Sequence, residues 1–275
     1  MCLKLFLGGS AEQLEAAGLP SYILPGPTNL VERSAEELAS LTRTPFRRVA
    51  FHRETLPIHE QGAQQVNRHD QQTPNALPAE FLDHLRMLED AYCQQDDPIR
   101  QSGFSGGPQR WRDERSPLLT AVETDGDLLD VGCANGYLLQ CLVGWAKERG
   151  ITIVPHGVDC GPRLIEMAQQ RIPSAAQNFH LANAWDWNPP RRYRYVYTLW
   201  DCVPDAFLAA YCRRLLNQVV EPNGRLILGM YGSRSRNIPP IDLGQKLQRL
   251  GFDVAGTTLG GDPPVTSFAW IDAGC

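Results

Sequence analysis

The sequence predicts an α/β fold: a doubly wound, seven-stranded, mostly parallel sheet preceded by a small N-terminal α/β appendage. Two observations support this prediction. From residue 127 onward, short apolar runs alternate with segments whose apolar residues recur at helical spacing, which is the pattern of βαβ units. The first run, Leu128–Val131, leads directly into a glycine-containing turn and then into a helical segment, as the first unit of such a sheet should.

Each predicted element follows from its own pattern. Strands are apolar runs bounded by glycine, proline or polar residues, and we expect them at 128–131, 152–158, 178–181, 193–199, 224–230, 252–255 and 266–271. Helices have apolar residues three and four positions apart, and we expect them at 137–149, 162–171, 207–220 and 243–250. These elements form a core domain over 127–275.

Two further helices should lead into this core and cap it, over 78–122. Apolar residues recur at helical spacing from Phe81 to Tyr92, and Pro78 is acceptable in the first turn of a helix. After a glycine-rich break at 102–107, a second helix is expected at 109–122. With these helices the main domain spans 78–275.

The first 77 residues have a different character. Short apolar runs and helix-capping signals predict a small α/β appendage over 1–56, whose role the sequence does not indicate. Residues 57–77 are polar and rich in glutamine, with almost nothing to bury, which is typical of a linker.

Composition excludes several classes of protein. No apolar run approaches the roughly 18 residues that a membrane helix needs, and the N-terminal run is too short for a signal peptide, so we expect a cytoplasmic protein without a membrane partner. A net charge of −5 argues against binding nucleic acid over the whole surface. The eight cysteines form no C-x-x-C pair and have no histidine at metal spacing, so we expect free thiols and no metal site.

The turn after the first predicted strand is a candidate ligand site. Glycine is needed wherever backbone N–H groups must approach a ligand closely or φ must be positive. The stretch Asp130-Val-Gly-Cys-Ala-Asn-Gly136 supplies Gly132 and Gly136, with Ala134 between them. Alone, this turn is a weak signal, because a purely structural turn is the alternative.

A carboxylate at the end of the second predicted strand strengthens the interpretation. Asp159 closes the run Gly157-Val-Asp159, where a carboxylate can accept both hydroxyls of a ribose. The alternative is that Asp159 caps the next helix, because Gly161 and Pro162 lead straight into one.

Four stretches in order then resemble the motifs of class I S-adenosylmethionine-dependent methyltransferases. They are Leu-Leu-Asp-Val-Gly-Cys-Ala-Asn-Gly (128–136), His-Gly-Val-Asp (156–159), Leu-Ala-Asn-Ala (181–184) and Glu-Pro-Asn-Gly-Arg-Leu (221–226). The resemblance covers roughly residues 96–271. It implies a Rossmann-like fold, S-adenosyl-L-methionine as cofactor and an enzyme that transfers a methyl group.

In that family the glycine-rich loop holds the amino-acid end of the cofactor, the acid after the second strand holds the ribose, and a polar residue after the third strand meets the adenine N6. Carried over residue by residue, the resemblance implies cofactor-binding roles for Asp130, Gly132, Cys133, Gly136, Asp159, Asn183 and Ala184. Asn183 replaces the more usual Asp, which makes the adenine contact the weakest of these, and Ala134 replaces a common Gly.

Three residues outside these motifs are further candidates. Trp111 and Arg115 lie in a segment that resembles the cap which many small methyltransferases fold over the cofactor, and Arg115 could pair with the cofactor carboxylate. The alternative is a packed tryptophan and a solvated arginine. Asp201, in the loop after the fourth strand, is a candidate general base, and a solvated or helix-capping aspartate is the alternative.

The sequence therefore predicts a methyltransferase with an unidentified acceptor, which we expect to be a small molecule. Nucleic acid is not favoured, because the basic clusters at 191–194 and 233–236 are more typical of solvated faces in an acidic chain. A methyltransferase-like binding protein without catalysis is one alternative. An NAD(P)-dependent oxidoreductase is another, although its fingerprint is G-x-G-x-x-G and the turn here is G-x-A-x-G. The oligomeric state is not indicated.

Overall fold

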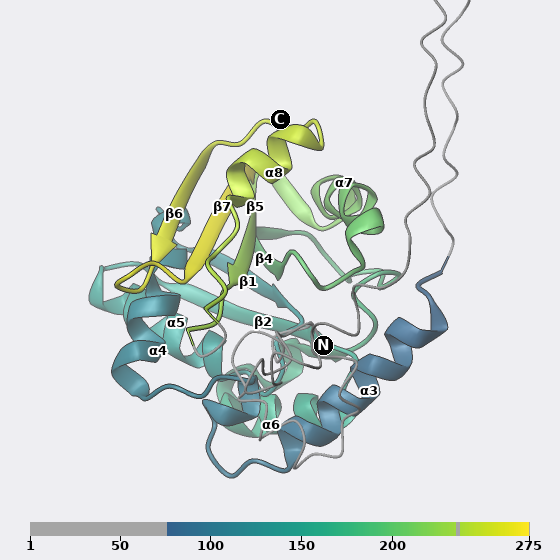
Figure 1. Cartoon of the computed structure of the whole chain (residues 1–275), viewed down its shortest axis with the longest axis vertical. Helices are drawn as coiled ribbons and strands as arrows, with labels where there is room; N and C mark the ends of the chain where they lie inside the picture. Colours follow the sequence, from purple (N-terminus) through teal and green to yellow (C-terminus); the bar gives the residue numbers. More distant parts are fainter. Residues whose placement is uncertain (1–75, 235–236, 275) are drawn as a thin grey trace, which may run out of the picture. The chain divides into compact units, whose positions relative to one another are not determined.

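The computed structural model describes residues 76–234 and 237–274, and all of them belong to one compact unit. The predicted appendage over 1–56, and all but the last two residues of the predicted linker over 57–77, lie outside the described residues. The described part is a seven-stranded sheet flanked by helices (Figure 1). Within it, no helix combines the length and apolarity needed to cross a membrane.

The sheet has the strand order β3-β2-β1-β4-β5-β7-β6. Strands β1 to β5 run parallel, and β7 is antiparallel to both of its neighbours. The strands are β1 (Gly126–Val131), β2 (Ile153–Asp159), β3 (Phe179–Leu181), β4 (Tyr193–Leu199), β5 (Val220–Tyr231), β6 (Gly256–Gly260) and β7 (Thr266–Asp272). The predicted seven-stranded, mostly parallel sheet is confirmed.

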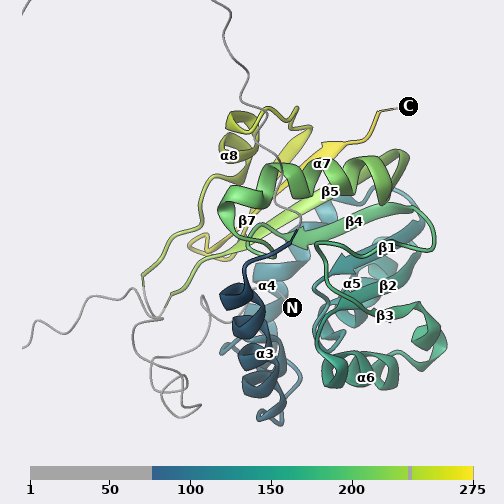
Figure 2. The ribbon, with the colours of Figure 1, turned by 90° about the vertical axis from the view of Figure 1, so that its right-hand side faces the viewer.

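The helices cover both faces of the sheet. The chain winds from β1 to β3 in one direction and from β4 to β5 in the other, and right-handed crossovers place the two sets of helices on opposite faces. Figure 2 shows α7 and α8 on one side of the sheet and α5 and α6 on the other. The α-helices are α3 (Ala79–Cys93), α4 (Pro108–Arg115), α5 (Tyr137–Glu148), α6 (Pro162–Arg171), α7 (Leu208–Gln218) and α8 (Leu243–Arg249). The 3₁₀ turns are η2 (Arg100–Ser102), η3 (Ser116–Ala121), η4 (Pro173–Asn178) and η5 (Asp205–Phe207).

The predicted helix over 109–122 is wrong in its second half. The α-helix α4 ends at Arg115, and the chain continues as the 3₁₀ turn η3. Pro117 has no N–H to donate to the carbonyl of Asp113, so the α-helical ladder cannot continue there. The Asp113 carbonyl instead accepts the N–H of Gly261 at 3.1 Å.

The predicted strand over 252–255 is also wrong, because Phe252 belongs to the end of α8. Gly251 has φ +84°, and its N–H bonds the carbonyl of Gln248. The Phe252 N–H bonds the carbonyl of Leu247 at 3.1 Å. These two bonds form a Schellman cap, in which the residue after the glycine is apolar. The strand β6 therefore begins only at Gly256.

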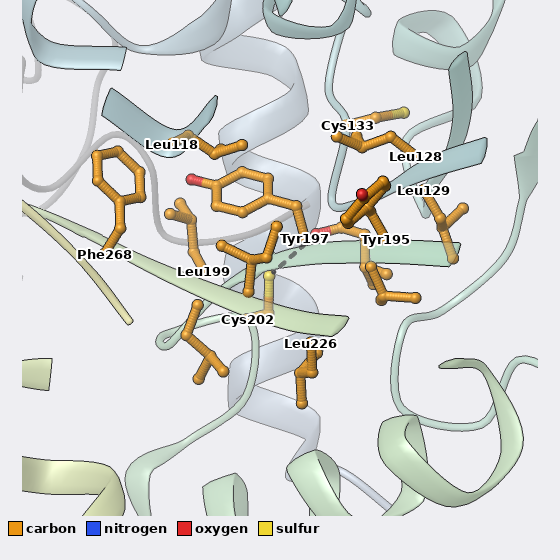
Figure 3. Close-up of a cluster of buried hydrophobic side chains, with 14 of the residues drawn as sticks. Leu118, Leu128, Leu129, Cys133, Tyr195, Tyr197, Leu199, Cys202, Leu226 and Phe268 are labelled. Atoms are coloured by element: carbon orange, nitrogen blue, oxygen red, sulfur yellow. Dashed lines mark hydrogen bonds between the residues drawn. The ribbon is translucent and has the colours of Figure 1, made fainter. Parts of the chain in front are cut away.

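The core is made of buried aliphatic and aromatic side chains, many of which project from the central strands (Figure 3). Leu128 and Leu129 of β1 have no exposed surface, and the ring centroid of Tyr197 of β4 lies 6.4 Å from that of Phe268 of β7. Truncating one such leucine to alanine typically costs about 2–5 kcal/mol of stability. This packing fixes the strand ends from which the candidate site is built.

Candidate cofactor site

The candidate site lies at the carboxyl edge of the parallel strands. The loops after β1, β2, β3 and β4 all leave the sheet at this edge because the strands run parallel. The winding direction reverses between β1 and β4, and in open α/β sheets ligands bind outside the carboxyl ends of the strands at such a point. Three of the four motif stretches end at this edge, whereas the fourth, at 221–226, lies in the first part of β5, at the opposite edge of the sheet.

The β1–α5 loop folds as the glycine pattern predicts. Gly132, Ala134 and Gly136 have φ of +85°, +47° and +72°, in the left-handed region that favours glycine. At Gly136 a Cβ would also lie 2.9 Å from the Cβ of Ala168 on α6, so any side chain there would collide with the neighbouring helix. The usual Gly is replaced by Ala134 at the position with the smallest positive φ of the three, where alanine is less strained.

Asp159 connects two loops of the site. Its carboxylate is 1% exposed, its Oδ2 accepts the N–H of Ala134 at 2.9 Å, and its Oδ1 accepts the N–H of Gly161 at 2.9 Å. The second bond is the local capping role that the sequence analysis kept as the alternative.

A cavity lies where the chain leaves β2, and its volume of about 280 Å³ is close to the lower limit of the roughly 300–1,000 Å³ that is usual for ligand pockets. Asn183, which follows β3, lines it, together with Cys160 and Gly161 after β2. The Asn183 Oδ1 accepts the N–H of Trp185 at 2.8 Å, which fixes the side chain. The carbonyl of the adjacent Ala184 accepts a hydrogen bond from Arg214.

Helix α3 forms the other wall of this cavity, a role that the sequence analysis missed. Four of its residues line the cavity: Leu82, Leu85, Arg86 and Glu89. The helix is attached at the N-terminus of α6, where the Arg163 N–H donates to the Glu89 carboxylate at 2.9 Å (Figure 1). Positions three and four apart share one helix face, so this mixture of leucines and charges on one face was visible in the sequence.

The cap helix α4 contributes one apolar and one charged side chain. Trp111 is 3% exposed and packs against Phe104 and Tyr137, with ring centroids 5.3 and 5.5 Å away, so the packed alternative describes it well. Arg115 is 5% exposed, and its guanidinium lies 3.5 Å from the ring centroid of Tyr231. The alternative of a solvated arginine is therefore wrong for Arg115.

Three buried tyrosines accompany Arg115. The hydroxyls of Tyr197 and Tyr231 are 2.5 Å apart. Burial raises the pKa of Tyr92 well above its ordinary value, nearby Asp159 and Asp201 raise it further, and Arg115 opposes them. The raised pKa keeps the buried hydroxyl protonated, so Tyr92 can act as a hydrogen-bond donor. The sequence analysis assigned Tyr92 only to helix packing.

The remaining candidates lie at the same edge. Asp130 has no exposed surface and stands in register with Gly157 of β2 and Tyr197 of β4. Cys133 is 2% exposed, and a Cβ on Gly157 would lie 2.7 Å from its Sγ, so that glycine makes room for it. Asp201 is half-buried in the turn after β4.

The cysteine prediction is only partly correct. Free thiols are found at Cys93, Cys133, Cys141, Cys160 and Cys212. Cys202, however, is disulfide-bonded, so the expectation that every cysteine is free is wrong. Among the residues that the structure describes, no group of His, Cys, Asp or Glu side chains is arranged to hold a metal ion.

The sheet is doubly wound, and the four motif stretches lie at the strands and loops where the resemblance requires them. The chain has a class I methyltransferase fold. No family model and no curated protein matches the chain. The fold is therefore recognised from the order and direction of its strands and from the position of its motifs.

Three solved structures illustrate this likeness. A methyltransferase from Aquifex aeolicus is 14% identical, with a TM-score of 0.44 over 61% of this chain and 94% of that one. A Thiobacillus denitrificans methyltransferase bound to S-adenosyl-L-homocysteine is 20% identical, with a TM-score of 0.41 over 68% and 76%. The [4+2]-cyclase SpnF is 12% identical, with a TM-score of 0.44 over 58% and 80%. Likenesses of this strength carry no argument about activity, which must come from the residues themselves.

Proposed function

We propose that the chain is an S-adenosylmethionine-dependent methyltransferase that acts on a small-molecule acceptor. The observation that carries this proposal is the position of Asp159. Its buried carboxylate bonds the glycine-rich loop on one side and the wall of the α3 cavity on the other. A ribose bound to this carboxylate would hold its base in the cavity and its 5′ substituent at the loop.

The residues around Asp159 fit the other parts of the cofactor. Leu82 and Leu85 offer apolar surface to an adenine ring, and no described residue accepts a hydrogen bond from the Asn183 Nδ2. An N–H₂ donor suits an adenine ring nitrogen, whereas the N6 contact expected from the family needs an acceptor. Arg115 would pair with the carboxylate of the amino-acid end through a charge-assisted bond.

The protein has little chemistry to add. When bound, the cofactor supplies a sulfonium that is already a strong methyl donor, so the residues mainly align donor and acceptor and exclude water. Where the acceptor atom carries a proton, a positioned carboxylate can remove it. Asp201, in the turn after β4 at the same edge of the sheet, is the carboxylate to which we assign this role.

Two features favour this function over a nicotinamide-dependent oxidoreductase. The turn has the pattern G-x-A-x-G, whereas the dinucleotide fingerprint is G-x-G-x-x-G. The buried cation Arg115 suits a carboxylate at the amino-acid end of the cofactor. A binding protein without catalysis would use the same cofactor contacts. Only turnover separates that alternative from the proposal.

Calorimetric titration tests the cofactor first. We expect S-adenosylmethionine and S-adenosylhomocysteine to bind and NAD not to bind. Binding of NAD without a response to S-adenosylmethionine would refute the proposal.

Turnover is tested with methyl-labelled cofactor and a cell extract. Label should enter small metabolites, and label confined to protein or nucleic acid would contradict the acceptor class. Binding without any transfer would favour the non-catalytic alternative. Asp201→Asn should abolish transfer and leave cofactor affinity unchanged, with Asp253→Asn, at an exposed position, as the matched control.

A further inference from the structure

Three arginines surround one buried carboxylate next to the cap. The Glu114 carboxylate is 2.7 Å from Arg110 Nε, 3.2 Å from Arg234 Nε and 3.4 Å from Arg115 Nη1. Arg110, Glu114 and Arg115 come from α4, and Arg234 follows β5. Among the described residues, Glu114 is the only carboxylate within ion-pair distance of any of the three, so the cluster has an excess of two positive charges.

This excess charge is partly removed from water. Arg115 is 5% exposed, and no described residue accepts a hydrogen bond from its Nε. The guanidinium carbons of Arg110 and Arg115 each lie 4.8 Å from the ring centroid of Phe104. Arginine cannot lose its proton in a protein, and a buried charge is costly unless it is paired. The cluster is therefore built to take up anions.

One anion does not neutralise the cluster. The proposed function assigns the cofactor carboxylate to Arg115, and one positive charge then remains on Arg110 and Arg234. Their side chains are 36% and 29% exposed, so a second ligand can reach them. Arg110 uses only Nε in described hydrogen bonds, and Arg234 uses Nε and Nη2, the latter towards the carbonyl of Pro263.

The position of the cluster in the sheet indicates which molecule supplies the second anion. The cofactor cavity lies at the ends of β2 and β3, whereas Arg234 follows the end of β5, on the far side of β1 and β4 in the sheet. We infer that Arg110 and Arg234 bind an anionic group of the acceptor, a carboxylate or a phosphate. The inference rests on the proposed function, because it assumes that the cofactor occupies Arg115.

The test uses the full chain saturated with S-adenosylhomocysteine and three probes of similar shape: benzoate, phenylphosphate and benzamide. Calorimetry should show saturable binding of at least one anion and markedly weaker binding of neutral benzamide. Preference for phenylphosphate or for benzoate distinguishes a phosphate from a carboxylate. Benzamide binding as tightly as the anions, or no binding of either anion, would overturn the inference.

Two charge-removing variants locate the binding site. Arg234→Gln and Arg110→Gln should each weaken the preferred anion about tenfold to a hundredfold while leaving the affinity for S-adenosylhomocysteine unchanged. Arg234→Lys should restore part of the lost affinity. Arg112→Gln is the matched control, because Arg112 lies on the same helix and pairs with Glu148 outside the cluster. An equal loss in Arg112→Gln would show only general surface attraction.

Failure of this inference is distinguishable from failure of the proposed function. S-adenosylhomocysteine affinity is measured before any probe is added, and absence of that binding contradicts the methyltransferase. In that case the probes are titrated without it, and the same comparison of Arg234→Gln with Arg112→Gln decides whether the cluster binds anions.

Discussion

The Asp159 carboxylate accepts the backbone N–H of Ala134 at 2.9 Å, and this bond joins the end of β2 to the glycine-rich loop after β1. The same carboxylate accepts the N–H of Gly161 at 2.9 Å. A residue expected to bind the ribose therefore also holds the loop that should bind the rest of the cofactor. Its two roles are distinguished by two separate measurements, one of stability and one of cofactor affinity.

Replacing Asp159 should cost both stability and cofactor affinity. Asp159→Ala removes an acceptor from two buried N–H groups, and we expect a loss of about 1–3 kcal/mol in the free energy of unfolding, measured by urea titration. Calorimetry should show cofactor binding weaker by about 1–3 kcal/mol. Asp253→Ala, at an exposed position, is the control. If the variant is fully folded under the conditions of the titration and its cofactor affinity is unchanged, the ribose assignment is refuted.

The requirement for glycine at position 136 has two causes that can be measured apart. Gly136 and Gly150 have similar φ, +72° and +76°, but a Cβ would meet Ala168 only at Gly136 and nothing within 4 Å at Gly150. Gly150→Ala should therefore cost only the left-handed strain, about 1 kcal/mol. Gly136→Ala should cost roughly 1–3 kcal/mol more, the usual effect of overpacking. Equal losses in urea titrations would show that the close approach to α6 is relieved easily.

Much of the fold was predictable because local chemistry and tertiary structure agree in the central units. The helix at Pro162–Arg171 and the strand at Tyr193–Leu199 were predicted at their observed limits. The failures have local causes that apolar periodicity does not contain. Pro117 stops α4, and Gly251 draws Phe252 into a helix cap.

The site was predictable only where its residues lie in motifs. Asp159 and the loop ending at Gly136 follow predicted strands, so their meeting at one edge follows from a parallel sheet. Two other features depend on how distant segments pack. One is Glu89 in the wall of the cavity, and the other is Arg234 beside Glu114. No sequence spacing connects Glu114 to Arg234, because the contact spans 120 residues.

The role of Arg115 can be tested with two ligands that differ in one end. S-adenosylhomocysteine carries an amino-acid carboxylate, whereas methylthioadenosine has the same adenosine and no carboxylate. Arg115→Gln should weaken S-adenosylhomocysteine about tenfold to a hundredfold and leave methylthioadenosine unchanged in calorimetry. Glu114 keeps Arg110 and Arg234 as partners in this variant. Equal weakening of both ligands would assign Arg115 to packing instead of carboxylate binding.

His156 should make stability depend on pH. Burial and, to a smaller extent, the neighbouring His180 together lower its pKa to about 4. Asp127 Oδ1 lies 3.4 Å from its Nε2, which would favour the charged form, but Asp127 also pairs with Arg191. We expect burial to prevail, so the folded state holds a neutral imidazole while the unfolded chain takes up a proton near pH 6.5.

The sign follows from proton uptake. Between pH 6.5 and 4 the unfolded state binds more protons, so the stabilisation by His156 is complete above pH 6.5 and is lost as the pH falls towards 4. Urea titrations at pH 7.5 and 4.5 should show a drop in the free energy of unfolding that is smaller in His156→Gln, by on the order of 2 kcal/mol. His84→Gln removes a histidine with a less perturbed pKa and should change the drop less. If His156→Gln loses as much stability on acidification as the unmodified chain, Asp127 holds the imidazole charged in the folded state and outweighs burial.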